Sequence, residues 1–200
     1  PAVGPLLHLA VPPGHEVKRG KWSFAHLPVI PPRFDLLPIE RNESRLNLLL
    51  RLIKRKDITG LINACDAGRE GELIFRYIVQ HARTKKPIER WWLQSMTPQS
   101  IRDGFASLRA DREMLPLADA AKSRSEADWL VGINGTRAMT AFNSKEGGFY
   151  LTTVGRVQTP TLAILVERGE RIRAFTPRDY WEVQARFGAR LAEIDKGVAK

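Results

Sequence analysis

The chain has 200 residues and a formal net charge of +10, because 32 Lys and Arg outnumber 22 Asp and Glu. Its content of 43% hydrophobic and 27% charged residues is ordinary for a globular protein. The single cysteine, Cys65, excludes internal disulfides and cysteine-rich zinc sites, and no apolar run approaches the roughly 18 residues of a membrane span. The charge favours a polyanionic partner, most simply nucleic acid, although a basic but unoccupied surface explains it equally well.

The first half of the chain predicts an α/β unit. Residues 1–40 are rich in proline and are expected to be irregular, because proline disfavours helix at the residue before it. Leucines on one face predict a helix over 42–56, and an apolar run predicts a strand over 61–65. An acidic turn and an amphipathic helix follow, and a second strand over 88–93 closes the unit.

The second half predicts mainly helix. Two threonine-proline pairs each place a capping residue before a proline at the first helical position. An alanine-rich segment has helical periodicity, and a later segment alternates apolar and polar residues as a half-buried strand does. The predicted elements are helices over 97–108, 115–142 and 159–172 and a strand over 180–187.

The strongest functional signal lies in residues 61–78, where an apolar strand ends at a glycine-containing acidic turn. Asp66 and Glu70 follow the carboxyl end of that strand, where ligands of open α/β sheets bind. Their hard oxygens suit one Mg²⁺ that keeps several waters. Acids in the first turn of a helix also stabilise its dipole without any metal, so the spacing alone leaves both interpretations open.

Two later segments combine arginine with polar partners. Arg124 and Asp128 are four residues apart on one predicted helix. They form either a surface ion pair or an arginine that holds a phosphate while Asp128 orients its guanidinium. Arg156 and Gln158 directly precede a predicted helix N-terminus, which favours anions. As an isolated pattern, this second segment is equally consistent with a capped turn.

In this order and spacing, these segments resemble the type IA DNA topoisomerases, most closely their topoisomerase III branch. The opening of the chain is also similar, so the resemblance covers nearly all of it. Four ordered motifs are far more specific than any one of them. The matching stretches are 61–78, 91–105, 124–137 and 151–166, the last running into 178–183.

The resemblance implies a fold and a reaction. It implies an α/β Toprim domain over 1–93 without its first strand, a mainly α-helical domain that grips single-stranded DNA over 94–176, and the start of an arch-shaped β domain over 177–200. In the family reaction, a tyrosine attacks a DNA phosphodiester and forms a 5′-phosphotyrosine link. Another strand passes through the gap, and the released 3′-hydroxyl reseals it, with Mg²⁺ and without ATP.

The resemblance also assigns roles to residues of this chain. Asp66 and Glu70 match the metal-binding acids, and Glu70 with its basic neighbour Arg69 matches the catalytic positions. The residues that match the DNA-binding positions are Arg124, Asp128, Thr153, Arg156 and Gln158. We expect a monomer in the cytoplasm, associated with the nucleoid if the host is bacterial, that relaxes or decatenates DNA and has no membrane contact.

The chain departs from the family pattern at the acidic turn. Gly68 stands where the family usually has a second aspartate, which leaves two carboxylates for the metal. Glu72 is a further acid that we expect to face outward from the first turns of the helix. None of the three tyrosines has the sequence context of the family nucleophile, which we expect beyond Lys200, and the first Toprim strand is expected before Pro1.

Two other classes of function stay open. The first is a Toprim nuclease or primase, in which the acidic turn serves hydrolysis or nucleotide transfer. The second is a non-catalytic single-stranded-DNA-binding module whose acidic turn is only the start of a helix. The arginine-containing segments argue against the nuclease, because a Toprim hydrolase has no evident need for them.

Overall fold

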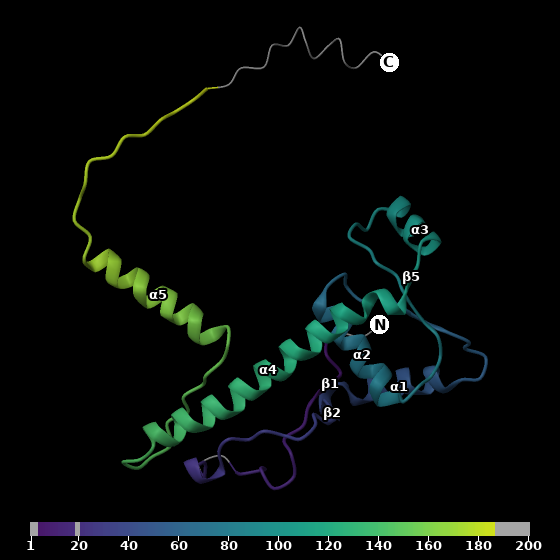
Figure 1. Cartoon of the computed structure of the whole chain (residues 1–200), viewed down its shortest axis with the longest axis horizontal. Coiled ribbons are helices and arrows are strands. Elements are labelled where there is room, and N and C mark those ends of the chain that lie inside the picture. The colour runs from purple at the N-terminus through teal and green to yellow at the C-terminus, as the bar shows by residue number, and fades with distance from the viewer. Residues whose placement is uncertain (1–3, 19–20, 187–200) are drawn as a thin grey trace. The chain divides into compact units, whose positions relative to one another are not determined.

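The computed structural model describes residues 4–18 and 21–186. Its internal contacts divide the chain into two compact units, Pro1–Pro160 and Thr161–Lys200, and each unit is described by itself. The first unit contains both sheets and most of the helices (Figure 1). The mixed α/β class expected from the sequence is therefore confirmed.

The acidic turn follows the first strand of a three-stranded sheet. Strand β3 (Leu61–Asn63) lies parallel to β4 (Ile88–Arg90), and β4 pairs antiparallel with β5 (Arg109–Ala110). Parallel neighbours need a crossover connection, which α2 (Arg69–Ala82) supplies. Helix α1 (Glu43–Lys54) precedes β3, and α3 (Pro98–Ala106) joins β4 to β5. The strands and helices expected over 42–108 are thus present, and Thr97 caps α3 as expected, since its Oγ1 accepts the Ser100 N–H.

A second, two-stranded sheet forms where the sequence suggested only irregular chain. Strand β1 (Leu7–Leu9) pairs antiparallel with β2 (Leu36–Pro38). The expectation of irregular structure over 1–40 is wrong for these strands, because proline is tolerated at strand ends and on edge strands. The buried leucines of β1 pack with Leu46 of α1 and with Tyr77 and Ile78 of α2 to form the main core.

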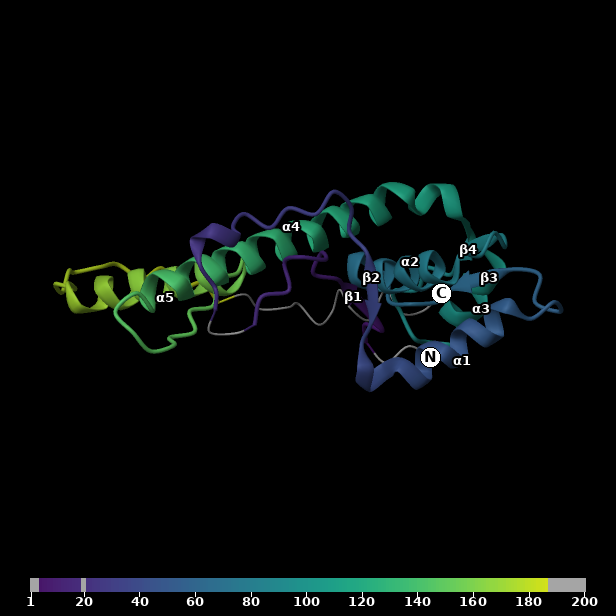
Figure 2. The same cartoon turned by 90° about the horizontal axis from the view of Figure 1, so that it is seen from below.

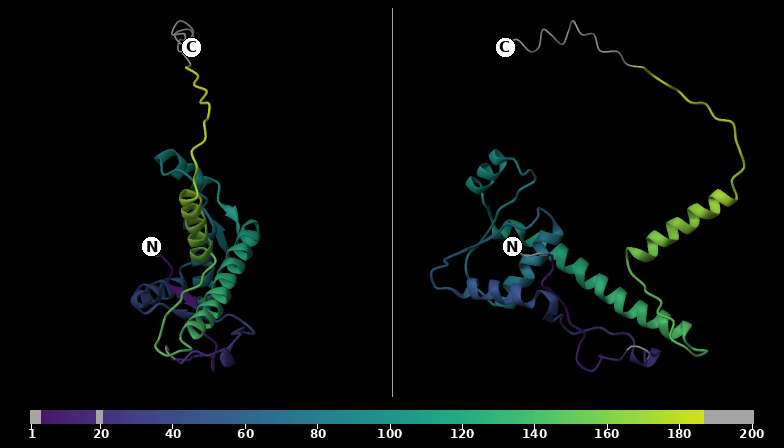
Figure 3. Two further views of the ribbon diagram at one scale, coloured as in Figure 1. Left: turned by 90° about the vertical axis from the view of Figure 1, so that its left-hand side faces the viewer. Right: turned by 180° about the vertical axis from the view of Figure 1, so that it is seen from behind.

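The long helix α4 (Asp111–Asn143) runs along much of the first unit and packs against α2 (Figure 2). It begins four residues before the expected start, because Asp111 and Glu113 favour the first turn and Glu113 accepts the Ala110 N–H at 3.4 Å. Residues 10–18 and 21–35 run along its second half (Figure 3). Asn134 holds them there by donating to the Val29 carbonyl at 2.9 Å and accepting the Val29 N–H at 2.6 Å.

Helix α5 (Gln158–Arg173) begins at the end of the first unit and supplies the regular structure found among the described residues of the second. The strand expected over 180–187 is not formed by Tyr180–Arg186, and Phe187 lies outside the described residues. A half-buried strand needs a partner strand, and none pairs with this segment among the residues described. Within the described ranges, none of the helices has the length and apolar character needed to cross a membrane.

Candidate nucleic-acid and metal site

The acidic turn places two unpaired carboxylates at the start of α2. Asp66 and Glu70 are exposed, and neither carboxylate makes a hydrogen bond or ion pair with a residue that the structure describes. Gly71 explains why the turn is so tight. A Cβ on this residue would lie 2.2 Å from the Asp66 carbonyl oxygen, so only glycine lets α2 pack against the Asp66 backbone. Among the described residues, no group of three or more His, Cys, Asp or Glu side chains is placed to hold a metal ion.

Arg90 holds the backbone of this turn from the end of β4. It is 1% exposed, and its Nη2 donates to the Asp66 carbonyl at 2.6 Å. Its Nη1 donates to the carbonyls of Cys65 at 2.7 Å and Asn63 at 2.8 Å. The residue therefore fixes three successive parts of the loop that carries Asp66. Sequence analysis missed it, and the only available signal was a lone arginine at the end of an apolar strand.

Glu72 corrects an expectation, because its side chain is fully buried and does not face outward. The carboxylate accepts Asn63 Nδ2 at 2.9 Å and Arg76 Nε at 2.7 Å, and it lies 3.4 Å from Arg90 Nε. The reason is Arg90, a buried charge that needs a counter-charge in the same interior. Burial lowers the pKa of the Arg90 guanidinium, and the charge of Glu72 opposes that shift. The Glu72 carboxylate is therefore occupied by these structural contacts and is not available to bind a metal ion.

The same network ties α2 to α4. Arg76 Nη2 donates to Asp111 Oδ1 at 2.7 Å, so one arginine joins Glu72 to the first turn of α4. Burial opposes its charge, but the hydrogen bonds that Arg76 donates to Asp111 and Glu72 outweigh this and raise the pKa of Arg76. Burial raises the pKa of the Cys65 thiol, which makes this cysteine a poor nucleophile.

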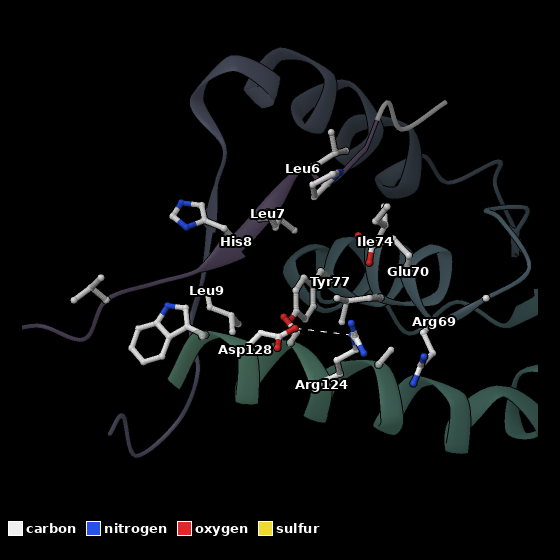
Figure 4. A pocket seen from close by; sticks show the side chains of 17 residues that line it. Leu6, Leu7, His8, Leu9, Arg69, Glu70, Ile74, Tyr77, Arg124 and Asp128 are labelled. Atoms are coloured by element: carbon white, nitrogen blue, oxygen red, sulfur yellow. Dashed lines mark hydrogen bonds and ion pairs between the residues drawn. The ribbon is translucent and has the colours of Figure 1, made fainter. Parts of the chain in front are cut away.

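A pocket of about 860 Å³ brings four of the expected site residues together (Figure 4). Arg69 and Glu70 reach it from the start of α2, and Arg124 and Asp128 reach it from α4. Apolar side chains of β1 and α2, including Leu7 and Ile74, form the rest of its wall. Residues that are far apart in the sequence thus surround one cavity with both acidic and basic groups.

Asp128 links this pocket to the second basic segment. Its Oδ1 accepts Arg156 Nη1 at 3.0 Å, and its Oδ2 lies 3.9 Å from Arg124 Nε. The arginine side chains remain 48% (Arg124) and 42% (Arg156) exposed. Both alternatives for Arg124 and Asp128 are thus compatible with the geometry, since the ion pair is present and the guanidinium groups can still bind an anion.

The remaining expected site residues lie outside the pocket wall. Asp66 contributes its backbone to the loop described above, whereas Thr153 and Gln158 are exposed. Gln158 is the first residue of α5, and the turn before it closes through Gly155 N–H donating to Thr159 Oγ1 at 3.1 Å. The DNA-binding roles of Thr153 and Gln158 stay predictions.

Comparison with known proteins gives one consistent result. A family model described as DNA topoisomerase matches residues 112–199. The chain is 42% identical to DNA topoisomerase 3 of Bacillus subtilis strain 168, over 92% of this chain and 25% of the relative. It is 41% identical to DNA topoisomerase 3 of Bacillus cereus ATCC 10987, with the same coverage. It is also 41% identical to DNA topoisomerase 3 of Shouchella clausii KSM-K16, over 90% of this chain and 24% of the relative.

By these matches the chain belongs to the type IA DNA topoisomerase family. Within that family it is a topoisomerase III-like segment, as the sequence motifs indicated. The chain spans about a quarter of the length of the curated relatives it matches.

Proposed function

We propose that this chain is the part of a topoisomerase III-like enzyme that holds single-stranded DNA beside a Mg²⁺ site. The whole enzyme cuts and reseals one DNA strand through a 5′-phosphotyrosine link and relaxes or decatenates DNA without ATP. The observation that supports this is the pocket shared by Arg69, Glu70, Arg124 and Asp128, with Arg156 bonded to Asp128. The unpaired carboxylate of Glu70 and the exposed guanidinium groups around one cavity suit a phosphodiester and its counter-ion.

In this proposal the arginines bind the DNA backbone. Arg124 and Arg156 donate to phosphate oxygens, and Asp128 orients both guanidinium groups. Arg69 faces the same cavity and stabilises negative charge that develops on the phosphoryl oxygens. Thr153 and Gln158 add neutral contacts to the same strand.

The carboxylates fit Mg²⁺ by their chemistry. Asp66 and Glu70 offer hard oxygen donors that no described side chain occupies, and Mg²⁺ is commonly held by one or two carboxylates while it keeps several waters. Asp66 and Glu70 would hold the ion. When bound, it would offset the charge of the phosphate and help to place it. Glu70 and Arg69 are the residues of this chain that we assign to the catalytic centre.

The domain scheme and setting belong to the same proposal. Residues 1–93 act as a Toprim-like domain, 94–176 as the DNA-gripping helical domain, and 177–200 as the start of an arch domain. The protein works as a monomer in the cytoplasm. The β5–α4 region, where Arg76 joins the first two of these parts, supports a close connection between them.

A binding experiment tests the first part. The 200-residue chain is mixed with a fluorescently labelled single-stranded oligonucleotide, and anisotropy is recorded before the sample is denatured and run on a gel. We expect binding without a covalent protein–DNA adduct, because the nucleophile is assigned to a tyrosine outside this sequence. A covalent adduct would refute that assignment, and shortened oligonucleotide would favour the nuclease alternative.

A second experiment tests the metal site. In the full-length protein that carries this sequence, Asp66→Asn and Glu70→Gln should together lower Mg²⁺-dependent relaxation of negatively supercoiled plasmid by at least tenfold, while single-stranded DNA binding persists. Glu89→Gln, at an exposed acid of β4, is the matched control. Unchanged relaxation in the double variant would leave only the binding-module account.

A further inference from the structure

An extended segment, residues 150–155, is attached along α4 by threonine hydroxyl groups. Thr136 Oγ1 accepts the Val154 N–H at 3.0 Å and faces the Val154 carbonyl oxygen at 3.4 Å. Thr140 Oγ1 accepts the Thr152 N–H at 3.0 Å and faces the Thr152 carbonyl oxygen at 3.5 Å. A hydroxyl group can both accept and donate a hydrogen bond. Each threonine can therefore serve both the N–H and the carbonyl of one residue, as a residue of a neighbouring strand would. We call these four contacts the threonine ladder.

The spacing of the ladder follows from backbone geometry. Four residues of an α-helix rise about 6 Å, and two residues of an extended chain advance about 6.6 Å. Hydroxyls four apart on α4 therefore meet every second residue of the segment, in antiparallel order. Continuing this order by one step pairs position 132 with position 156, and position 132 is Gly132. One further turn along α4 lies Asp128, which accepts the Arg156 side chain at 3.0 Å.

Glycine lets the segment approach the helix closely. A Cβ on Gly135 would lie 2.7 Å from Val154 Cγ1 and 2.9 Å from Val154 Cβ. Thr140 is 1% exposed, so its contacts with Thr152 at one end of the ladder are shielded from water. Asn143 adds a further contact by donating Nδ2 to Thr152 Oγ1 at 2.7 Å. The segment is therefore fixed in one register along α4.

We infer that Thr136 and Thr140 are positioning residues for Arg156, because their hydroxyls set the register that brings its guanidinium to Asp128 beside the pocket. The inference rests on the proposed function, in which Arg156 binds a DNA phosphate. It adds two residues that touch neither DNA nor metal and that act through the backbone of 152–156. In the same arrangement, Thr152 and Val154 face α4 while Thr153 between them stays exposed.

Isosteric substitution tests this inference on the 200-residue chain. Thr136→Val and Thr140→Val keep the side-chain shape and remove the hydroxyl, whereas Thr136→Ser and Thr140→Ser keep the hydroxyl. The double valine variant should bind a fluorescein-labelled oligodeoxythymidylate roughly tenfold more weakly, the effect of one lost charge-assisted hydrogen bond. The double serine variant should restore most of the affinity. Thr59→Val, at an exposed threonine outside the ladder, should change nothing.

The Arg156→Ala background separates positioning from general loss of structure. If the ladder acts through Arg156, the valine substitutions should weaken binding by less than twofold in a chain that already lacks Arg156. Thermal unfolding of each variant shows whether it is folded at the assay temperature. The serine variants provide the comparison if a valine variant is not folded.

The outcomes are distinct. If Arg156→Ala weakens binding and the valine variants do not, or if they weaken it equally in the Arg156→Ala background, the inference is overturned and the proposed function stands. If Arg156→Ala binds as tightly as the unsubstituted chain, both are overturned. Serine variants that bind as weakly as the valine variants would also overturn the inference, because the hydroxyl would then not be the active group.

Discussion

At the scale of single residues, the buried pair of Glu72 and Arg90 should matter most for stability. Removing one partner of a buried ion pair costs about 3–5 kcal/mol, because the other charge stays desolvated and uncompensated. Glu72→Gln keeps the shape and removes the charge that faces Arg90 and Arg76. We expect the free energy of unfolding to fall by about 3 kcal/mol, measured by urea denaturation followed by circular dichroism.

Glu89→Gln is the matched control for that prediction. Glu89 is the residue before Arg90 on the same strand, but its side chain is exposed, so this variant should change stability by less than about 0.5 kcal/mol. A loss below about 1 kcal/mol for Glu72→Gln would contradict the assignment. It would mean that Arg90 does not depend on this carboxylate.

Gly68 gives a prediction for the metal site. Its backbone is extended, with φ of 171°, and a Cβ there would have nothing within 4 Å, so a side chain fits. Gly68→Asp adds a third carboxylate to the turn that carries Asp66 and Glu70. A carboxylate and a divalent ion about 4 Å apart interact by about 2 kcal/mol in water, twice the value for two unit charges, so Mg²⁺ should bind roughly thirtyfold more tightly by isothermal titration calorimetry.

Gly68→Asn separates charge from helix capping in that experiment. Asp and Asn cap helix N-termini about equally well, so both variants should stabilise α2 while only the aspartate should tighten Mg²⁺ binding. Equal Mg²⁺ affinity in the two variants would contradict the placement of the ion at this turn.

At the scale of elements, two glycines of α4 give a matched pair. Gly135→Ala places a methyl group within 2.7 Å of Val154 Cγ1, whereas a Cβ on Gly132 comes no closer than 4.0 Å to the Val154 carbonyl oxygen. Overpacking typically costs about 1–3 kcal/mol, while alanine in place of glycine inside a helix gains up to about 1 kcal/mol. Gly135→Ala should therefore lower the melting temperature, and Gly132→Ala should leave it unchanged or raise it. A reversed order would show that residues 150–155 do not pack against α4 in this way.

The sequence predicted elements well where periodicity and caps were strong. Thr97 with Pro98 marked the start of α3, and the spaced leucines marked α1. It failed where structure depends on partners distant in sequence. The pairing of β1 with β2 joins segments almost 30 residues apart across a proline-rich stretch, and no local pattern reports it.

The site was predictable to a similar degree. The motifs located Arg69, Glu70, Arg124 and Asp128, and the pocket brings these four together. Burial was the missing information for the rest. Glu72 was expected outside because acids usually are, and its partner Arg90 gave no recognisable pattern. Thr136 and Thr140 are also missing from sequence analysis, since threonines four apart on a helix are common and only the extended partner segment gives them a role.

At the scale of the whole molecule, two effects should contribute to DNA binding. The net charge of +10 attracts any polyanion, and the arginines at the pocket make particular phosphate contacts. Salt separates the two. Each phosphate contact to single-stranded nucleic acid contributes about −0.7 to the slope of log affinity against log salt concentration. A residue that contacts a phosphate therefore changes the slope when it is replaced, whereas a distant charge mainly changes the overall field.

Arg124→Gln and Arg156→Gln should each reduce the magnitude of that slope by about 0.7. Arg55→Gln removes the same charge at an exposed arginine that is paired with Asp57 and lies outside the pocket wall. The salt slope of this variant should change by less than half as much. The measurement is anisotropy titration with single-stranded oligonucleotide between about 50 and 200 mM salt, the range over which counter-ion release is large. Equal changes in all three variants would mean that the chain binds DNA through its overall charge. The larger change in Arg124 and Arg156 would instead locate the phosphates beside Asp128.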